Sequence, residues 1–283
     1  MAEVSEAGGE HVLLHAKQHA SSSRDISGGR LAFASLADAD LTSAKLRGAD
    51  LCNADLRRAN LSDATLTSAD LTLSNCRGAS FDGASLDDAR LQAINRAGSG
   101  PADTRFRGAD CTRATLKHSN LSGCDFTNAI LHRADFTRAN LQESDFRGAD
   151  LTGADLSFCN LSGASLANAS LVGATLTACD LRGVDLRGAD LTLANLNGCQ
   201  LAGANVSKAL WSKTVVARVT GLESAEGLAA LCYGDPSSID LWTLEKCIEA
   251  LPFALLQHVG ITPQMYRMLG EQAGLAARRA VSA

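Results

Sequence analysis

The chain has 283 residues, enough for one large domain or two ordinary ones. Its hydrophobic content of 46% is typical of a globular protein, but only 4% of its residues are aromatic, which excludes a wide conventional core. The formal net charge of −5, from 26 basic and 31 acidic residues, excludes the clearly basic face of a typical nucleic-acid binder.

The sequence carries no recognisable targeting or membrane signal. The apolar run near the N-terminus is only Val12–Leu14, far shorter than the core of a signal peptide. No run approaches the roughly 18 apolar residues of a membrane span. Nine cysteines, an odd number, suit reduced thiols better than a disulfide framework. We therefore expect a cytoplasmic protein with no membrane contact.

Residues 1–29 form an N-terminal segment that we expect to be a partly flexible cap. His11, His15 and His19 follow helical spacing and would share one face of a helix. A metal site would need a fourth ligand and a rigid frame, and neither is evident, so a solvated or capping helix is favoured.

A repeat with a period of five follows the N-terminal segment. From Leu31 to Val206 a large apolar residue recurs at every fifth position, with one lapse. The residue two before this centre is small, usually Ala, and the residue just before it is often Asp or Asn, as in Ala54-Asp55-Leu56. This period fits neither a helix nor a flat strand. It predicts a chain that turns a corner every five residues and closes a square coil in four sides.

The same pattern predicts what fills the coils. The large centre, such as Leu161, and the small residue two before it should point into a narrow lumen. Asp or Asn suits a corner, where its side chain accepts backbone N–H groups. Residues 30–210 would make about nine coils stacked at about 4.8 Å, a rod roughly 43 Å long.

The motif Ala-(Asp/Asn)-Leu-x-x resembles that of the pentapeptide-repeat family, and the resemblance covers residues 30–210. It implies an all-β solenoid, a right-handed quadrilateral parallel β-helix. The resemblance also implies two candidate functions. Some members of the family use loops to act on gyrase, and some imitate duplex DNA.

A coil of twenty residues predicts which side chains stack. Two columns result: Phe106, Phe126 and Phe146, and Cys159, Cys179 and Cys199. The phenylalanines should stack in the lumen. The cysteines replace the inward Ala and lack the short spacing of metal-binding thiols, so buried small groups are favoured over a metal site. We expect no cofactor.

The lapse in the repeat falls at residues 92–105. Gly98-Ser99-Gly100-Pro101 is typical of a loop. The segment could continue the coil as two irregular sides or leave a corner as an extruded loop, and we favour the loop. Loops on rigid scaffolds commonly bind other proteins, which makes Asn95 and Arg96 candidate contacts.

Basic side chains gather in the two coils after the lapse. They are Arg113, Lys117, His118, His132, Arg133 and Arg138, and they form either a solvated face or a docking patch for an acidic partner. A small acidic spot at Asp82, Asp87 and Asp88 precedes the lapse. Phe158 occupies an outward position that is normally polar, and it is a candidate contact.

Residues 211–283 show helical signals in place of the repeat. Ser238 could cap a helix over Leu241–Leu251, and Thr262-Pro263 is a good start for another. An open solenoid end must be covered, so we expect an α-helical cap. Its apolar residues predict that these helices also mediate either formation of a homodimer or binding of a partner.

No motif in the sequence supports catalysis: phosphate loop, nucleophile elbow and metal cluster are all missing. We therefore expect a non-enzymatic scaffold that binds a protein partner of unknown identity. The alternative is a DNA-mimicking modulator of gyrase or another type II topoisomerase, although acidic and basic residues nearly balance along the rod. A bacterial effector delivered to host cells is a further alternative. We expect no direct binding of nucleic acid.

Overall fold

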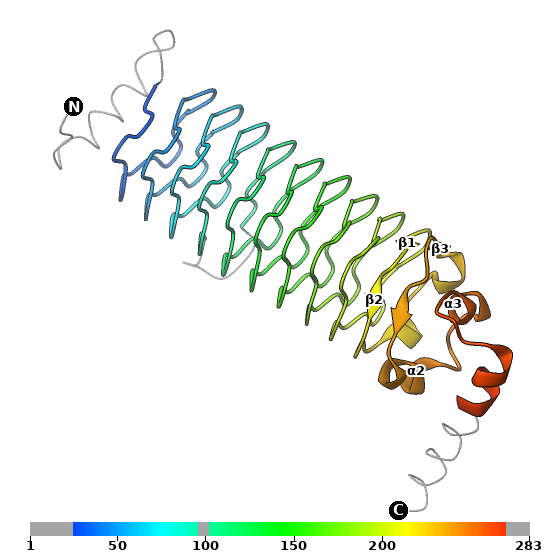
Figure 1. The fold of residues 1–283 in the computed structure, drawn as a ribbon. Helices are drawn as coiled ribbons and strands as arrows, with labels where there is room; N and C mark the ends of the chain where they lie inside the picture. The colour runs from blue at the N-terminus through cyan, green and yellow to red at the C-terminus, as the bar shows by residue number, and fades with distance from the viewer. Residues whose placement is uncertain (1–24, 96–101, 270–283) are drawn as a thin grey trace, which may run out of the picture.

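The computed structural model describes residues 25–95 and 102–269. They form an elongated rod of stacked coils with short helices at its C-terminal end (Figure 1). Backbone positions twenty residues apart pair in parallel, for example Asp50 with Asp70 and Asp145 with Ser165. Each side of a coil contributes a single paired residue, because the chain turns before a second residue can join the ladder. This pairing confirms the predicted β solenoid.

A tight turn closes each unit of five residues. In one unit the N–H of Ala164 donates to the carbonyl of Leu161 at 2.9 Å. The second central residue of the turn has a positive φ, 68° at Gly163 and 57° at Asn168. This geometry is that of a type II turn, which favours Gly and Asn at that position. The corner therefore falls two residues after the centre, and its predicted place at the Asp or Asn before the centre was wrong.

The Asp or Asn before the centre stabilises the turn from its own paired position. The Asp150 carboxylate accepts the N–H of Thr152 at 3.0 Å, and Asn160 Oδ1 accepts the N–H of Ser162 at 3.0 Å. The short polar side chain thus accepts a backbone N–H, as expected of these residues.

Phenylalanine rings stack along the lumen. The ring centroids of Phe106 and Phe126 lie 4.7 Å apart, and those of Phe126 and Phe146 lie 4.8 Å apart, with nearly parallel planes. The predicted column is therefore present. Phe81 extends it, with its ring 5.0 Å from that of Phe106.

The three aligned cysteines are buried at the inward small position. Their thiols donate to main-chain carbonyls of Phe136, Leu156 and Leu176, in that order, at 3.0, 2.8 and 2.8 Å from Cys159, Cys179 and Cys199. Burial raises the pKa of Cys159 to about 12, so its thiol stays protonated. Each cysteine thus acts as a small lumen group with one main-chain hydrogen bond. Leu161, a centre residue, is fully buried beside them.

One coil near the middle of the rod is five residues longer than its neighbours. Across it the pairing joins Ser80 to Arg105 and Arg90 to Thr115, a separation of 25 residues. Two irregular sides would have kept the separation at twenty, so the structure contradicts that alternative; residues 96–101, where the predicted loop would lie, are outside the described residues. The longer coil also explains why Phe81 stacks on Phe106.

A buried polar cluster joins the two described segments on either side of residues 96–101. Asn95 Oδ1 accepts the N–H of Cys76 at 2.6 Å, in the place where other coils use a main-chain carbonyl. Asn95 Nδ2 donates to Thr104 Oγ1 at 3.3 Å, and Thr104 Oγ1 donates to the Cys76 carbonyl at 2.9 Å. The side chains of Asn95 and Thr104 therefore replace the missing ladder contacts.

Main-chain pairing continues beyond the predicted boundary at residue 210. Strand β1 (Leu210–Trp211) pairs with β3 (Cys232–Tyr233), and β2 (Val215–Val216) pairs with β4 (Ser238–Ile239). The short 3-10 helices η1 (Leu222–Ser224) and η2 (Leu228–Ala230) lie between them. The first part of the expected helical region thus adds a further, longer turn of the solenoid.

Helices cover the end of the rod after this last turn (Figure 1). They are α2 (Leu241–Cys247), α3 (Phe253–His258) and a helical stretch over residues 263–269. The cap of α2 is Asp240, which accepts the N–H of Thr243 at 3.0 Å, and not Ser238, which lies in β4. Within the described ranges, no helix is long and apolar enough to cross a membrane.

A histidine fastens α3 to the last turn of the solenoid. His258 Nε2 accepts the N–H of Ser237 at 3.1 Å and contacts the Ser237 hydroxyl at 3.1 Å, and its ring stacks on Tyr233 at 4.6 Å. A nitrogen that accepts an N–H carries no proton, so this contact requires the neutral imidazole. Burial accordingly lowers the pKa of His258 below 6.5.

We predict that the stability of this cap falls when His258 becomes protonated. Because its folded pKa is lowered, its contribution is complete above the unfolded pKa of about 6.5 and is lost as the pH falls below that value. The carboxylates titrate lower, from an ordinary value of 3.8. Thermal melts at pH 7.5 and 5.5 should show a lower Tm at pH 5.5, and His258→Gln should reduce the difference. An equal difference in the variant would contradict this role.

Candidate protein-binding surface

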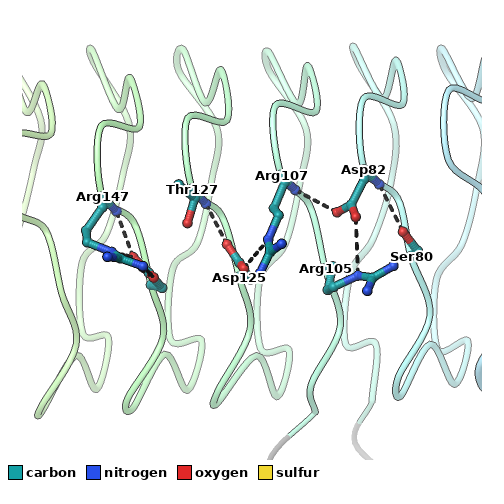
Figure 2. A network of polar contacts seen from close by, with 8 residues as sticks. Ser80, Asp82, Arg105, Arg107, Asp125, Thr127 and Arg147 are labelled. Carbon is teal, nitrogen blue, oxygen red and sulfur yellow. Dashed lines mark hydrogen bonds and ion pairs between the residues drawn. The ribbon is translucent and has the colours of Figure 1, made fainter.

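The walls of the rod carry ladders of paired charges. Figure 2 shows one of them, on the wall that includes Arg105 and Asp125. Arg105 lies 3.2 Å from Asp82, and Arg107 pairs with Asp125 on the next coil. Asp82 also accepts the backbone N–H of Arg107 at 3.1 Å, because Arg105 stands where an Asp or Asn normally caps the turn. Such exposed pairs contribute only about 0–1 kcal/mol each, but they cancel the local charge.

Three of the predicted basic residues are also paired. Arg113 lies 2.7 Å from Asp88 and 2.9 Å from Asp87. The pKa of Asp88 is lowered by its hydrogen bond from Arg113. The predicted acidic spot and part of the predicted basic patch thus form one cluster. Sequence reasoning missed this contact, because only the longer coil places Arg113 against Asp88.

Lys117 and His132 also contact carboxylates. Lys117 Nζ lies 2.7 Å from Asp135, and His132 Nε2 lies 2.7 Å from Asp150. The pKa of Lys117 is raised, mainly by its hydrogen bond to Asp135. Each side chain therefore has a carboxylate partner on the wall.

The remaining basic residues lie at corners of the rod. Arg133 and Arg138 are exposed, and neither forms a salt bridge within the part of the chain that the structure describes. The guanidinium of Arg138 lies 5.6 Å from the ring centroid of Phe158, which is 55% exposed. This distance permits a cation–π contact. Cation and aromatic ring thus face solvent together.

His118, Arg138 and Phe158 stack along one corner, and we call these three residues the corner row. The N–H of His118 donates to the Thr137 carbonyl, and the N–H of Arg138 donates to the Ser157 carbonyl, so each residue lies one coil from the next. Arg133 stands at the preceding corner of the coil that holds Arg138. The structure therefore stacks three of the predicted contact residues and places Arg133 at the adjacent corner.

Two other predicted contacts are not part of this surface. Asn95 is only 1% exposed and its side chain replaces a main-chain partner, so its assignment as a binding residue was wrong. Arg96 lies outside the described residues, as do His11, His15 and His19. Within residues 25–95 and 102–269, no group of three His, Cys, Asp or Glu side chains could hold a metal ion.

Comparisons with known proteins agree with the repeat. The model of the pentapeptide repeat region matches residues 129–206, and the model of pentapeptide repeats in eight copies matches residues 34–72, 59–95 and 102–133. No curated protein matches the chain.

Several solved structures are similar. HetL, a pentapeptide repeat protein involved in heterocyst differentiation regulation in the cyanobacterium Nostoc sp. strain PCC 7120, is 32% identical; the match covers 77% of this chain and 93% of HetL, with a TM-score of 0.47. A pentapeptide repeat protein from the Arabidopsis thaliana thylakoid lumen is 33% identical over 34% of this chain and 66% of its own, with a TM-score of 0.33. QnrB1, a plasmid-mediated fluoroquinolone resistance protein, is 16% identical over 77% of this chain and 93% of its own, with a TM-score of 0.32.

The family models together span more than half of the chain, and the match to HetL extends over most of both proteins. The stacked coils, the inward Leu or Phe and the inward Ala agree with the same repeat. The chain therefore belongs to the pentapeptide-repeat family.

Proposed function

We propose that this protein is a non-enzymatic scaffold that binds another protein where its surface departs from the repeat. The observation that carries the proposal is a contrast in charge. Many arginines on the walls pair with aspartates, as Arg107 does with Asp125, whereas Arg133 and Arg138 face solvent and Arg138 lies over the exposed ring of Phe158. Interfaces draw most of their energy from a few large groups, among which aromatic rings and arginine are common.

The same charge ladders argue against imitation of DNA. Duplex DNA carries about one negative charge per 1.7 Å, so a mimic needs a persistent acidic surface. Here Asp145, Asp180 and Asp185 each pair with the arginine two residues later. We therefore favour the scaffold over a protector of a type II topoisomerase that works by DNA mimicry.

We further propose that the helices at the C-terminal end join two copies of the chain. Leu241, Trp242 and Phe253 are between 42% and 56% exposed on α2 and α3. Apolar groups of this size in contact with water favour association. If light scattering gave the mass of a monomer, the proposed dimer would be wrong, but the proposed scaffold function would not be affected.

We also propose a cytoplasmic location, because the cysteines are free, as is usual in a reducing compartment.

Affinity capture with the full-length protein tests the scaffold. Arg133→Glu combined with Arg138→Glu should abolish recovery of a reproducible partner, because the reversed charges repel acidic groups. The matched control reverses Arg182 and Arg187, which are paired with Asp180 and Asp185 about two coils further along the rod. Equal recovery by both double variants would contradict binding through this surface. Recovery of gyrase or topoisomerase subunits would favour the alternative.

A further inference from the structure

The corners of the rod impose a backbone conformation that large side chains avoid. The second central residue of each turn has a positive φ, and Gly, Asn or a polar residue stands at most of these positions. Phe33, Leu73, Phe158 and Leu193 break this pattern, with φ of 61–62°. For a bulky residue such a φ costs free energy relative to glycine.

Burial does not offset this cost. The four side chains are between 49% and 76% exposed, so little of their apolar surface is buried and burial stabilises them little. Strained conformations retained without a structural gain are common at functional sites. Phe33, Leu73 and Phe158 moreover share one corner of the rod, since each belongs to the stack that includes the corner row.

Phe158 differs from the other three in the cation that lies over its ring. Arg138 and His118 occupy the two preceding coils of the same corner, and the Arg138 guanidinium lies over the Phe158 ring. On the adjoining wall, Asp135 is paired with Lys117, and Asp155 accepts the backbone N–H of Ser157 at 2.9 Å. No acidic residue interrupts the described corner around the row, whose successive members are Ala93, His118, Arg138, Phe158, Ala178 and Gly198.

We propose that the corner row is the docking site for an extended acidic segment of the partner protein, with one apolar side chain seated against Phe158. This inference rests on the proposed scaffold function and names the partner's chemistry. The row spans two coil spacings, roughly 10 Å, which about three residues of an extended chain cover. Carboxylates would then meet Arg138 and His118 while the apolar group covers the ring.

A labelled peptide tests this chemistry directly. The probe is a fluorescein-labelled peptide that contains Glu-Glu-Ser-Leu, titrated with the full-length protein and followed by fluorescence anisotropy. Binding should weaken at least tenfold with Phe158→Gly, and as strongly when Gln replaces both Glu residues. Raised salt should also weaken it, because exposed charges are screened within about 8–10 Å. Leu193→Gly is the matched control, a large apolar residue with the same φ on a different corner, and it should bind like the native protein.

Thermal melts separate binding from folding. Phe158→Gly and Leu193→Gly should both raise the Tm, because glycine adopts the positive φ without strain. Weaker peptide binding by a more stable variant cannot result from unfolding. A lower Tm for Phe158→Gly, peptide binding equal to that of the native protein, or no binding by the native protein would each overturn the proposal. If the full-length protein still captured its partner in any of these cases, the proposed scaffold function would hold and only the proposed docking site would be wrong.

Discussion

Phe126→Ala should lower the free energy of unfolding by about 3–5 kcal/mol, the largest effect expected of any substitution in the rod. The ring lies between two parallel neighbours, with centroids 4.7 Å and 4.8 Å away, and it meets the edge of Phe136 at 5.8 Å. Its removal leaves a cavity that a stacked solenoid cannot close, because the backbone spacing is set by the ladder. Urea unfolding followed by circular dichroism measures the change.

Phe33→Ala is the matched control, since Phe33 is 76% exposed at a corner. Its free energy of unfolding should change by no more than about 0.5 kcal/mol, as is usual for surface substitutions. A loss of stability in Phe33→Ala equal to that in Phe126→Ala would show that the rings of the lumen are not the main source of stability.

Leu161→Ala should be the next most damaging substitution, at about 2–5 kcal/mol. Leu161 is fully buried at a centre position, whereas the neighbouring Ser162 is partly exposed and donates only to Asn160, at 2.7 Å. Ser162→Ala should therefore stay within about 0.5 kcal/mol. Ala164→Leu should cost roughly 1–3 kcal/mol, because the lumen has no room for a larger group at the small position. Urea melts of these variants that gave equal losses would mean that the inward positions are wrong.

The repeat predicts the solenoid because each position of the five-residue unit occupies the same place in every coil. An inward large residue, an inward small one and a polar residue before the centre recur because every coil presents the same space to them. The Phe106–Phe126–Phe146 column follows from the same arithmetic. The place of the corner does not, since Gly and Asn at the positive φ alternate with Arg, Lys and Phe and so give only a weak signal.

The longer coil limited what could be predicted about the surface. A sequence shows that the repeat lapses but not how many residues leave the coil, so the contacts of Phe81 with Phe106 and of Arg113 with Asp88 were beyond reach. Asn95 was misread for the same reason, because its polar side chain in a loop-like segment resembles a binding residue. The contact of Arg138 with Phe158 is easier to predict, since a separation of twenty residues stacks the two positions.

The central claim is that a partner binds at the corner row and not at a plain wall of the rod. Photo-cross-linking tests it most directly, with p-benzoylphenylalanine placed at Phe158 in one variant and at Leu193 in another, each used in partner capture. The two positions share the same backbone conformation and equal exposure of 55%. The structure predicts a cross-linked partner from position 158 and none from position 193. Cross-linking from position 193 alone would contradict the claim.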